Sequence, residues 1–347
     1  TGSQGKTGTK DYLAYVLSAA GPTVATVGSF NNELGFPLTV LRADLDTEFL
    51  VLEMGARGIG HIAYLCEIAP PRIAAVLNVG TAHVGEFGSR EAIAQAKGEL
   101  VEALDDTGTA VLNADDPLVA AMADRTSGQV VTFGTKEYAD VRLAGVDLDD
   151  LGRASFTLSA DATSADVSLA VTGAHQAHNA AAAAAVAIAE GMDLGSAAAA
   201  LGRVTQVSRW RMELTELGDG RLLINDAYNA NPESMRAALD ALVAIAERRG
   251  GRAVAVLGEM RELGADSATA HADLGRDAAA RGVAHLIGVG EVTLPMVEAA
   301  IDHIPAASVP DRAAALAWLR SHLRPHDVVL IKASRGDRLE LLATSLI

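Results

Sequence analysis

The sequence contains a single cysteine and no long apolar run. One cysteine, Cys66, excludes a disulfide framework and any metal site built from several cysteines. It lies in a stretch with helical spacing, where a buried and unreactive thiol is the simplest interpretation. A membrane-spanning helix needs about 18 or more consecutive apolar residues, which no segment supplies, and no signal peptide opens the chain. These features favour a cytosolic protein without membrane insertion.

Positive charge is also scarce. The 347 residues include 28 Lys and Arg against 44 Asp and Glu, which gives a formal net charge of −16. The field of so acidic a protein repels nucleic acids and anionic membranes, so neither is expected as a partner, although a local site can still bind an anion. Only five of the 28 cations are lysines. Each lysine is therefore a candidate for chemistry that arginine performs less well.

The order of the apolar runs predicts an α/β protein. Half of the residues are hydrophobic, which is enough for sizeable cores, and the length allows two or three domains. Short β-branched runs first alternate with helical stretches, and this predicts a parallel sheet covered on both faces. Residues 140–172 instead alternate apolar and polar side chains between turn residues, so we expect a small antiparallel addition. An alanine-rich helix over 180–190 follows.

A second α/β block begins near Ser208. Its alternating strands and helices predict a Rossmann-like domain, including a helix over 232–249 with a proline in its first turn. No Gly-x-Gly-x-x-Gly follows its early strands, so a dinucleotide cofactor is not supported. We therefore expect two domains, over residues 1–207 and 208–347.

The chain opens on a candidate phosphate-binding loop, Gly2-Ser3-Gln4-Gly5-Lys6-Thr7. In such a loop the glycines let backbone N–H groups point at phosphate oxygens. Lys6 reaches the β- and γ-phosphates, and the hydroxyl of Thr7 can bind Mg²⁺. No strand precedes the loop in this sequence, so we expect that the chain was cut from something longer. A glycine-rich turn with an exposed lysine is the alternative.

Three further residues of the first block suit metal chemistry. Glu53 ends the apolar run over 49–53, at the edge where parallel sheets bind ligands, and could bind Mg²⁺ or merely cap a helix. His83 follows the next expected strand, over 73–78, although a solvated loop histidine is simpler. Lys97 is either a snorkelling lysine or a partly buried amine that reacts with CO₂. The resulting carbamate could hold a second Mg²⁺.

Two polar motifs suit nucleotide binding. The segment 175–179 precedes the alanine-rich helix, where Asn179 could contact a base or simply cap the helix. The segment 225–232 lies between a strand and a helix and is the most specific stretch of the chain. Within it Asp226 could bind ribose hydroxyls, and Asn231 could be the N-cap of the helix opened by proline.

Basic residues flank the second motif. Arg209 and Arg211 alternate with Trp210, as in a strand, and at least one could meet a γ-phosphate while the other is an ordinary surface charge. Ser334 and Arg335 follow another strand and belong at the same kind of edge, unless they only cap a helix. A P-loop switch without ligation is a rival, but its guanine-reading Asn-Lys-x-Asp is absent.

Together these segments resemble the Mur ligases of peptidoglycan synthesis, and within that family the MurF type, along the whole chain. The segment 226–232 resembles the MurF type more than the other members of the family. The Asp-Asn-Pro-Arg signature of the diaminopimelate-adding relatives is absent. The matching segments are Gly2–Thr7, 31–37, 53–55, His83, 96–99, 113–117, 226–232, 257–260 and 332–336. Family members carry an N-terminal domain that binds the UDP-muramoyl nucleotide, and this chain starts after it.

The resemblance implies an ATP-dependent ligase that forms a C–N bond through an acyl-phosphate. We separately expect a monomer, a state that the sequence itself does not reveal. Its partners would be ATP, UDP-N-acetylmuramoyl-tripeptide and D-alanyl-D-alanine, and its cofactors two Mg²⁺ ions. The implied ATP contacts are Gly2, Ser3, Gln4, Gly5, Lys6, Thr7, Asn179, Arg211 and Asp226. The implied metal ligands are Thr7, Glu53, His83 and carbamylated Lys97.

The resemblance also implies catalytic and substrate-binding residues. The catalytic set would be Lys6, His83, Lys97 and Arg211. Asn31 and Asn32 would face the muramoyl-peptide, and Tyr228, Asn229, Ser334 and Arg335 the dipeptide. Gly8 and Gln176 depart from the family pattern, which often has Thr and Asn at these positions. A folylpolyglutamate-type ligase, or a fragment that binds nucleotide without ligation, remains the alternative.

Overall fold

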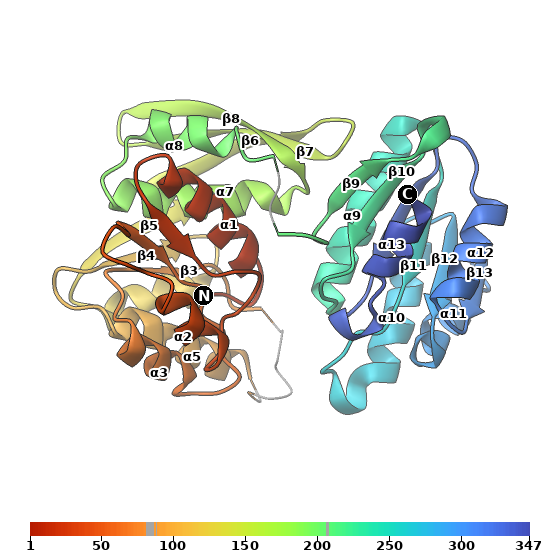
Figure 1. Ribbon diagram of the computed structural model, residues 1–347, viewed down its shortest axis with the longest axis horizontal. Coiled ribbons are helices and arrows are strands. Elements are labelled where there is room, and N and C mark those ends of the chain that lie inside the picture. Colours follow the sequence, from red (N-terminus) through yellow and green to blue (C-terminus); the bar gives the residue numbers. More distant parts are fainter. Residues whose placement is uncertain (81–86, 88, 206–207) are drawn as a thin grey trace. The chain divides into compact units, whose positions relative to one another are not determined.

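The computed structural model describes every residue except 81–86, 88, 206 and 207. The chain divides into two compact units, both visible in Figure 1. The first comprises Thr1–Leu148 and Arg153–Ser208, and the second comprises Asp149–Gly152 and Arg209–Ile347. In the described part of the chain, no helix is long and apolar enough to cross a membrane.

A six-stranded sheet forms the centre of the first unit, in the order β3-β4-β5-β6-β7-β8. The parallel strands are β3 (Ile73–Val76), β4 (Thr109–Asn113), β5 (Gln129–Gly134) and β6 (Val141–Leu148). The strands β7 (Arg153–Ala160) and β8 (Thr163–Thr172) continue the sheet antiparallel. The predicted parallel sheet with an antiparallel addition is thus confirmed. A separate parallel pair consists of β1 (Thr23–Ala25) and β2 (Phe49–Val51).

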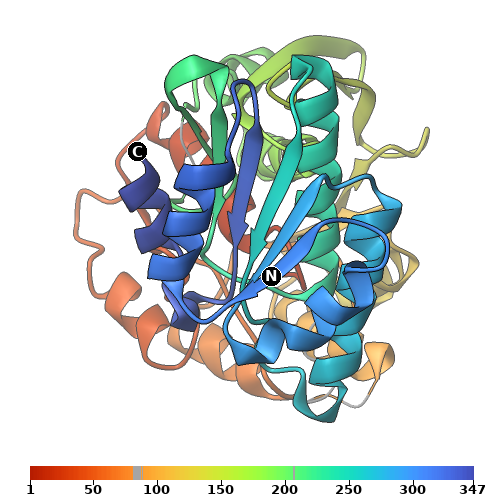
Figure 2. The same ribbon diagram turned by 90° about the vertical axis from the view of Figure 1, so that its right-hand side faces the viewer.

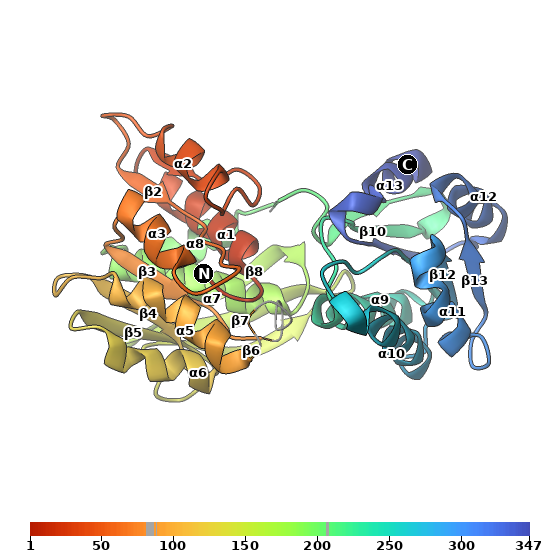
Figure 3. The same cartoon turned by 90° about the horizontal axis from the view of Figure 1, so that it is seen from below.

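Helices cover both faces of this sheet, because successive side chains of each buried strand point to opposite cores. One face carries α1 (Lys6–Ser18), α7 (His175–Ala189) and α8 (Leu194–Leu201), and the other carries α3 (His61–Ile68) and α5 (Arg90–Glu102). In Figure 1 α7 lies above β3, β4 and β5, and Figure 3 shows α3 and α5 nearer the viewer than α7. The alanines from Ala180 to Ala185 are fully buried, which lets α7 lie close to the strands. The short helices α2 (Gly35–Val40) and α6 (Pro117–Ala120), with the 3₁₀ turn η1 (Ala121–Arg125), complete the unit.

The second unit has a sheet in the order β13-β12-β11-β14-β10-β9, seen face-on in Figure 2. Its strands are β9 (Glu213–Glu216), β10 (Leu222–Asp226), β11 (Ala253–Leu257), β12 (His285–Val289), β13 (Ala306–Val309) and β14 (Val328–Lys332), and only β9 is antiparallel to its neighbour. One face packs on α9 (Pro232–Arg249), α10 (Ser267–Ala280) and α11 (Leu294–Ala300), and the other on α12 (Arg312–His322) and α13 (Glu340–Leu346). The 3₁₀ turns are η2 (Gly218–Gly220), η3 (Gly264–Asp266), η4 (Glu291–Thr293) and η5 (Arg335–Asp337).

Several elements differ from the sequence-based expectation. The helix that follows the phosphate loop begins within the loop motif, at Lys6, because Gly5 takes a left-handed conformation that turns the loop directly into α1. The edge strand β13 was not predicted, since Ala-Ala-Ser-Val has a weak strand signal. The segment 209–212, expected to alternate as a strand, is instead a turn with positive φ at Trp210 (60°) and Met212 (50°).

The strand register decides which residues meet at the carboxyl edge of the second sheet. Asp226, the last residue of β10, lies opposite Lys332, the last residue of β14. Lys332 in turn lies opposite Leu257, at the end of β11. Because ligands of open α/β sheets bind beyond this edge, the loops that follow these three strands form the natural site of the second unit.

Candidate active site

The phosphate loop is held against the residues that follow β3. The backbone N–H of Ser3 donates to the carbonyl of Asn78 (3.1 Å), and the Asn78 side chain accepts from the N–H of Gln4 (2.9 Å) and donates to its carbonyl (3.2 Å). Nζ of Lys6 donates to the carbonyl of Gly2 (2.8 Å), so it folds back over the loop. The loop thus lies at the carboxyl end of β3, directly before α1, and the first N–H groups of a helix favour an anion.

Asn179, on α7, packs against this loop. A Cβ on Gly5, whose φ is +76°, would lie 2.4 Å from Oδ1 of Asn179, and a Cβ on Gly8 would lie 2.8 Å from its Nδ2. The buried amide also donates to Oε1 of Gln176 (3.1 Å) and accepts from the hydroxyl of Thr9 (3.4 Å). Packing against Asn179 therefore explains the glycine at position 8. The expected contact of Asn179 with adenine stays a prediction.

Glu53 is a buried carboxylate, 3% exposed, just beyond β2. Its Oε1 accepts from Nδ2 of Asn31 (2.5 Å), and its backbone N–H donates to the hydroxyl of Thr26 (3.0 Å). Within the described residues, the buried Oε2 has no hydrogen-bond partner. An unsatisfied buried carboxylate oxygen is costly, and a bound cation would satisfy it. Oδ1 of Asn32 accepts from the N–H of Gly35 (2.8 Å) and so supports the start of α2.

Lys97 lies on α5 with only 6% of its surface exposed. Burial, reinforced by the charge of Lys6, lowers the pKa of Lys97 to about 7. No hydrogen bond or ion pair of its amine is found among the residues that the structure describes. A large part of this amine is therefore neutral near pH 7, which is the form that adds CO₂.

The neighbouring Glu99 has a structural task. Its carboxylate accepts from the backbone N–H groups of Gly60 (2.6 Å) and Ala63 (3.0 Å), and so fixes the N-terminus of α3. His83 lies outside the described residues, and Thr7 is buried in the first turn of α1. In residues 1–80, 87, 89–205 and 208–347, no group of three or more His, Cys, Asp or Glu side chains is suited to hold a metal. Metal binding by Thr7, Glu53, His83 and a modified Lys97 stays a prediction.

In the second unit, Asp226 and Lys332 form a buried ion pair. Nζ of Lys332 donates to Oδ2 of Asp226 (2.6 Å) and to the carbonyl of Asn229 (2.8 Å). The other oxygen, Oδ1, accepts from the backbone N–H of Met212 (3.1 Å). The residue expected at the ribose is thus also the anchor that connects the ends of β10 and β14 with the turn at 209–212.

Two arginine–aromatic pairs connect the same segments. The guanidinium of Arg211 lies 4.2 Å from the ring centre of Tyr228, and that of Arg335 lies 4.2 Å from the ring centre of Trp210. Nη1 of Arg335 also lies 2.5 Å from Oε1 of Glu340, which is buried in α13. Four residues predicted by the sequence analysis, Arg211, Asp226, Tyr228 and Arg335, are therefore brought together in one cluster.

Ser334 connects the loops that follow β11 and β14. Its N–H donates to the carbonyl of Glu259 (2.9 Å), and its hydroxyl accepts from the N–H of Arg261 (3.0 Å). Asp337 accepts from the N–H of Glu259 (2.7 Å), and burial raises the pKa of its carboxyl group. No functional role was predicted for Glu259 or Asp337, although the Leu-Gly-Glu-Met segment at the end of β11 pointed to this loop.

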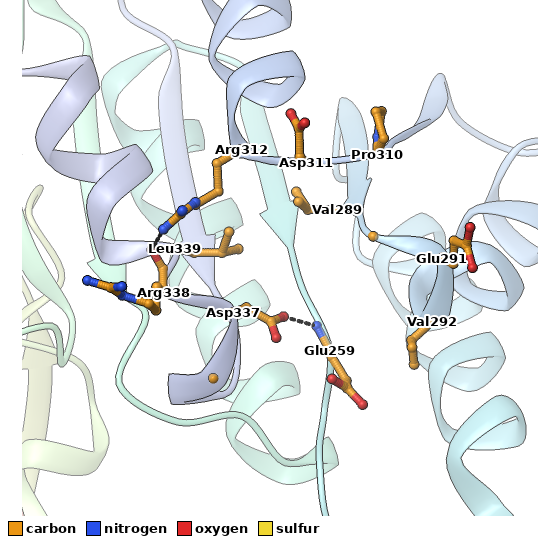
Figure 4. Close-up of a pocket in the computed structure, with 12 residues that line it drawn as sticks. Glu259, Val289, Glu291, Val292, Pro310, Asp311, Arg312, Asp337, Arg338 and Leu339 are labelled. Atoms are coloured by element: carbon orange, nitrogen blue, oxygen red, sulfur yellow. Dashed lines mark hydrogen bonds between the residues drawn. The ribbon is translucent and has the colours of Figure 1, made fainter.

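These loops border a pocket of about 300 Å³, shown in Figure 4. The chain segments that follow β11, β12, β13 and β14 supply its walls. Its charged lining residues are Glu259, Glu291, Asp311, Arg312, Asp337 and Arg338. Nη1 of Arg312 donates to the carbonyl of Arg338 (3.1 Å). Sequence reasoning missed this pocket because one of its four strands, β13, was not predicted.

A phosphate-loop α/β unit followed by a Rossmann-like unit is typical of enzymes that use a nucleotide. Comparison with known protein families identifies the family. Residues 1–187 match the Mur ligase middle domain, and residues 210–335 match the Mur ligase glutamate ligase domain. The chain is 51% identical, over its whole length, to the UDP-N-acetylmuramoyl-tripeptide–D-alanyl-D-alanine ligase of Mycobacterium tuberculosis, and it spans 72% of that protein. The chain belongs to the Mur ligase family.

Solved structures agree with this assignment. A crystal structure of MurF from Acinetobacter baumannii has a TM-score of 0.90 at 35% identity, covering 99% of this chain and 75% of that one. The MurF ligase of Thermotoga maritima, solved in complex with ADP, has a TM-score of 0.86 at 31% identity, covering 99% and 78%. The predicted fold class and family resemblance are thus confirmed.

Proposed function

We propose that this chain carries the ATP-binding and C-terminal parts of a ligase that joins D-alanyl-D-alanine to UDP-N-acetylmuramoyl-tripeptide in peptidoglycan synthesis. The observation that carries the proposal is the 51% identity, along the whole chain, to a curated ligase of that name. The ADP complex of the Thermotoga relative supports the use of ATP. Residues 1–207 would form the central ATP-binding domain, and residues 208–347 the C-terminal domain.

The reaction follows from the phosphate loop. The γ-phosphoryl group of ATP passes to the carboxylate of the tripeptide, which gives an acyl-phosphate and ADP. The amine of D-alanyl-D-alanine then attacks the acyl carbon, the new C–N bond forms, and phosphate leaves as the amine loses a proton. Lys6 and the N–H groups of residues 2–5 offset the negative charge that otherwise keeps nucleotide and carboxylate apart. Arg211 would meet the γ-phosphate and Asp226 the ribose.

The residues of the first unit fit Mg²⁺. The hydroxyl of Thr7 and the unsatisfied Oε2 of Glu53 are oxygen ligands of the kind that Mg²⁺ prefers. A carbamate on Lys97 would add a third anionic oxygen group for a second ion, together with His83. When bound, such ions neutralise phosphate charge and orient the transferring group. Asn31 would hold Glu53 in the orientation that exposes Oε2 to the ion.

The charged pocket of the second unit suits the dipeptide. D-Alanyl-D-alanine is a zwitterion, and the pocket combines the side chains of Arg312 and Arg338 with four carboxylates. Arginine would pair with the dipeptide carboxylate, and a carboxylate would hold its ammonium group until the proton leaves. Ser334 and Arg335 immediately precede the pocket wall formed by 336–339. We propose further that the enzyme acts as a monomer, in the cytoplasm where ATP is available.

A phosphate-release assay tests the function. With ATP, Mg²⁺ and UDP-N-acetylmuramoyl-tripeptide present, phosphate release should require D-alanyl-D-alanine, and the product should contain the new amide bond. Glutamate in place of the dipeptide is the matched control. Equal release with glutamate would favour a folylpolyglutamate-type ligase and overturn the proposal. ATP binding with no ligation, while a longer relative ligates in the same assay, would reduce the chain to a nucleotide-binding fragment.

A further inference from the structure

Lys332 has no role in the site as the family resemblance describes it, yet it is one of the most buried charges of the second unit. Only 3% of its surface is exposed. Its ammonium group donates to Oδ2 of Asp226 (2.6 Å) and to the carbonyl of Asn229 (2.8 Å). A single side chain from β14 therefore connects the end of β10 with the loop that leads into α9.

The same ammonium group acts on a second segment through Asp226. Oδ1 of that carboxylate accepts from the N–H of Met212, which closes the turn at 209–212. Trp210 and Met212 both take positive φ values there, a conformation that costs non-glycine residues energy and persists only when its surroundings impose it. The N–H of Tyr228 adds a second anchor by donating to the carbonyl of Trp210 (3.2 Å).

We propose that Lys332 is a positioning residue for ligation. Through Asp226 and Asn229, it holds the turn at 209–212 and the loop at 227–231 in a single arrangement. That arrangement sets Arg211 against the nucleotide and Tyr228 and Asn229 against the dipeptide. The inference rests on the proposed function, because it takes the roles of these residues from it.

The chemistry of the pair explains why lysine stands here. Lysine presents a compact charge on a flexible stem, whereas the wide guanidinium fork of arginine needs more room than a 3% exposed site offers. The carboxylate of Asp226 can accept about four hydrogen bonds, and two are used by Lys332 and Met212. The remaining lone pairs can accept from the two hydroxyls of a ribose, while Lys332 offsets the charge of Asp226 near the phosphates of ATP.

The test replaces Lys332 by methionine in a chain that carries Trp318→Phe. Because the sequence has only two tryptophans, the fluorescence of this background reports Trp210 alone. Lys136→Met, at an exposed lysine of the first unit, is the matched control. The measurements are the ATP dissociation constant, kcat, KM for D-alanyl-D-alanine, and the Trp210 emission, all well below the melting temperature.

In Lys332→Met, we expect kcat/KM for the dipeptide to fall about 100-fold, as for a misplaced reacting group. ATP binding should weaken together with it, and the Trp210 emission should shift. A protein that melts earlier but keeps its kinetic constants, ATP affinity and emission would overturn the proposal. If Lys332→Met does not fold, the same measurements are made on Lys332→Met with Asp226→Asn, which removes the unpaired buried charge. A normal KM for the dipeptide in that folded protein would overturn the proposal as well.

Failure of the proposed function gives a different pattern. If the unmodified chain shows no phosphate release that depends on D-alanyl-D-alanine, the ligase assignment falls. The ATP affinity and the Trp210 emission still decide whether Lys332 positions the turn, since neither measurement needs ligation.

Discussion

The two units treat their buried charges differently. In the second unit, Lys332 meets Asp226, and Glu340 meets Arg335. In the first unit, Glu53 has only the neutral amide of Asn31 at one oxygen, and no partner for the other among the described residues. A buried charge is costly unless it is paired. These two charges of the second unit are thus paired, although Oε2 of Glu340 has no hydrogen-bond partner among the described residues, whereas Oε2 of Glu53 is the oxygen that we propose binds an ion.

Three lysines are buried among the described residues, and Lys10 in the first unit already pairs with Asp11, so the contrast lies between Lys97 and Lys332. Lys97 and Lys332 are 6% and 3% exposed, yet only Lys332 has a carboxylate partner in the part of the chain that the structure describes. Because Lys97 is buried and also faces the charge of Lys6, its pKa falls to about 7. A lysine whose pKa is lowered in this way is a candidate for modification, and a lysine paired with a carboxylate can position its neighbours.

The largest expected effect comes from Lys97→Ala. If the amine becomes a carbamate that helps to hold Mg²⁺, its loss removes several kcal/mol of transition-state stabilisation. Phosphate release that depends on D-alanyl-D-alanine should then fall about 1000-fold. Acetate or formate should restore part of it by supplying the missing carboxylate, and Lys136→Ala should have no effect. Full activity of Lys97→Ala would contradict the proposed role of Lys97 in metal binding, since Lys97 would then be an ordinary snorkelling lysine.

A smaller effect is expected for Glu53→Gln, which keeps the shape of the side chain and removes its charge. Activity at a fixed Mg²⁺ concentration should fall about 100-fold and recover in part at high Mg²⁺, because an amide is a poorer ligand than a carboxylate. The metal-free protein should gain about 1 kcal/mol of stability, because a neutral amide costs less to bury than a charged carboxylate. Chemical unfolding and phosphate release measure the two effects, with Glu67→Gln, at an exposed residue of α3, as the control. A destabilised variant would show that Glu53 is already satisfied.

The pH dependence of the free energy of unfolding should report the lowered pKa of the Lys97 amine directly. Its pKa is about 7 in the folded chain against 10.5 for an ordinary lysine. Between these values the unfolded chain keeps a proton that the folded chain has lost, so the free energy of unfolding rises with pH. The contribution of one such group can reach about 1.4 kcal/mol per pH unit. Unfolding of the metal-free protein at pH 7 and pH 9, without bicarbonate, should show this slope, and Lys97→Met should lack it. Equal slopes in both proteins would argue against an unpaired amine.

The smallest expected effect tests the second unit. Asn231 is the N-cap of α9: its side chain accepts from the N–H of Ser234 (2.8 Å), and the hydroxyl of Ser234 accepts in return from the N–H of Asn231 (3.1 Å). Asn231→Ala should cost about 1 kcal/mol of stability and leave the ATP dissociation constant unchanged, while Asn231→Ser should restore the cap. Loss of ATP affinity at unchanged stability would make Asn231 a ligand contact instead.

Local patterns were enough to predict much of the fold. The helix Pro232–Arg249 lies where the sequence placed it, because a capped helix that opens on proline is a local signal. The turn at 209–212 could not be predicted this way. Its positive φ values at Trp210 and Met212 are imposed by Asp226, Tyr228 and Arg335, which lie far along the chain.

The same division holds for the site. Local sequence marked the phosphate loop, the acidic strand end at Glu53 and the polar segment that starts at Asp226, because glycines, strand ends and helix starts carry their chemistry in a few adjacent residues. The sequence by itself thus determined the α/β class, the phosphate loop and the resemblance to the Mur ligases. Only the tertiary structure decided that both lysines are buried and that, among the described residues, Lys332 has a carboxylate partner and Lys97 has none. Burial and pairing depend on strand register and on packing between distant segments, and these set the pKa and the role of each lysine.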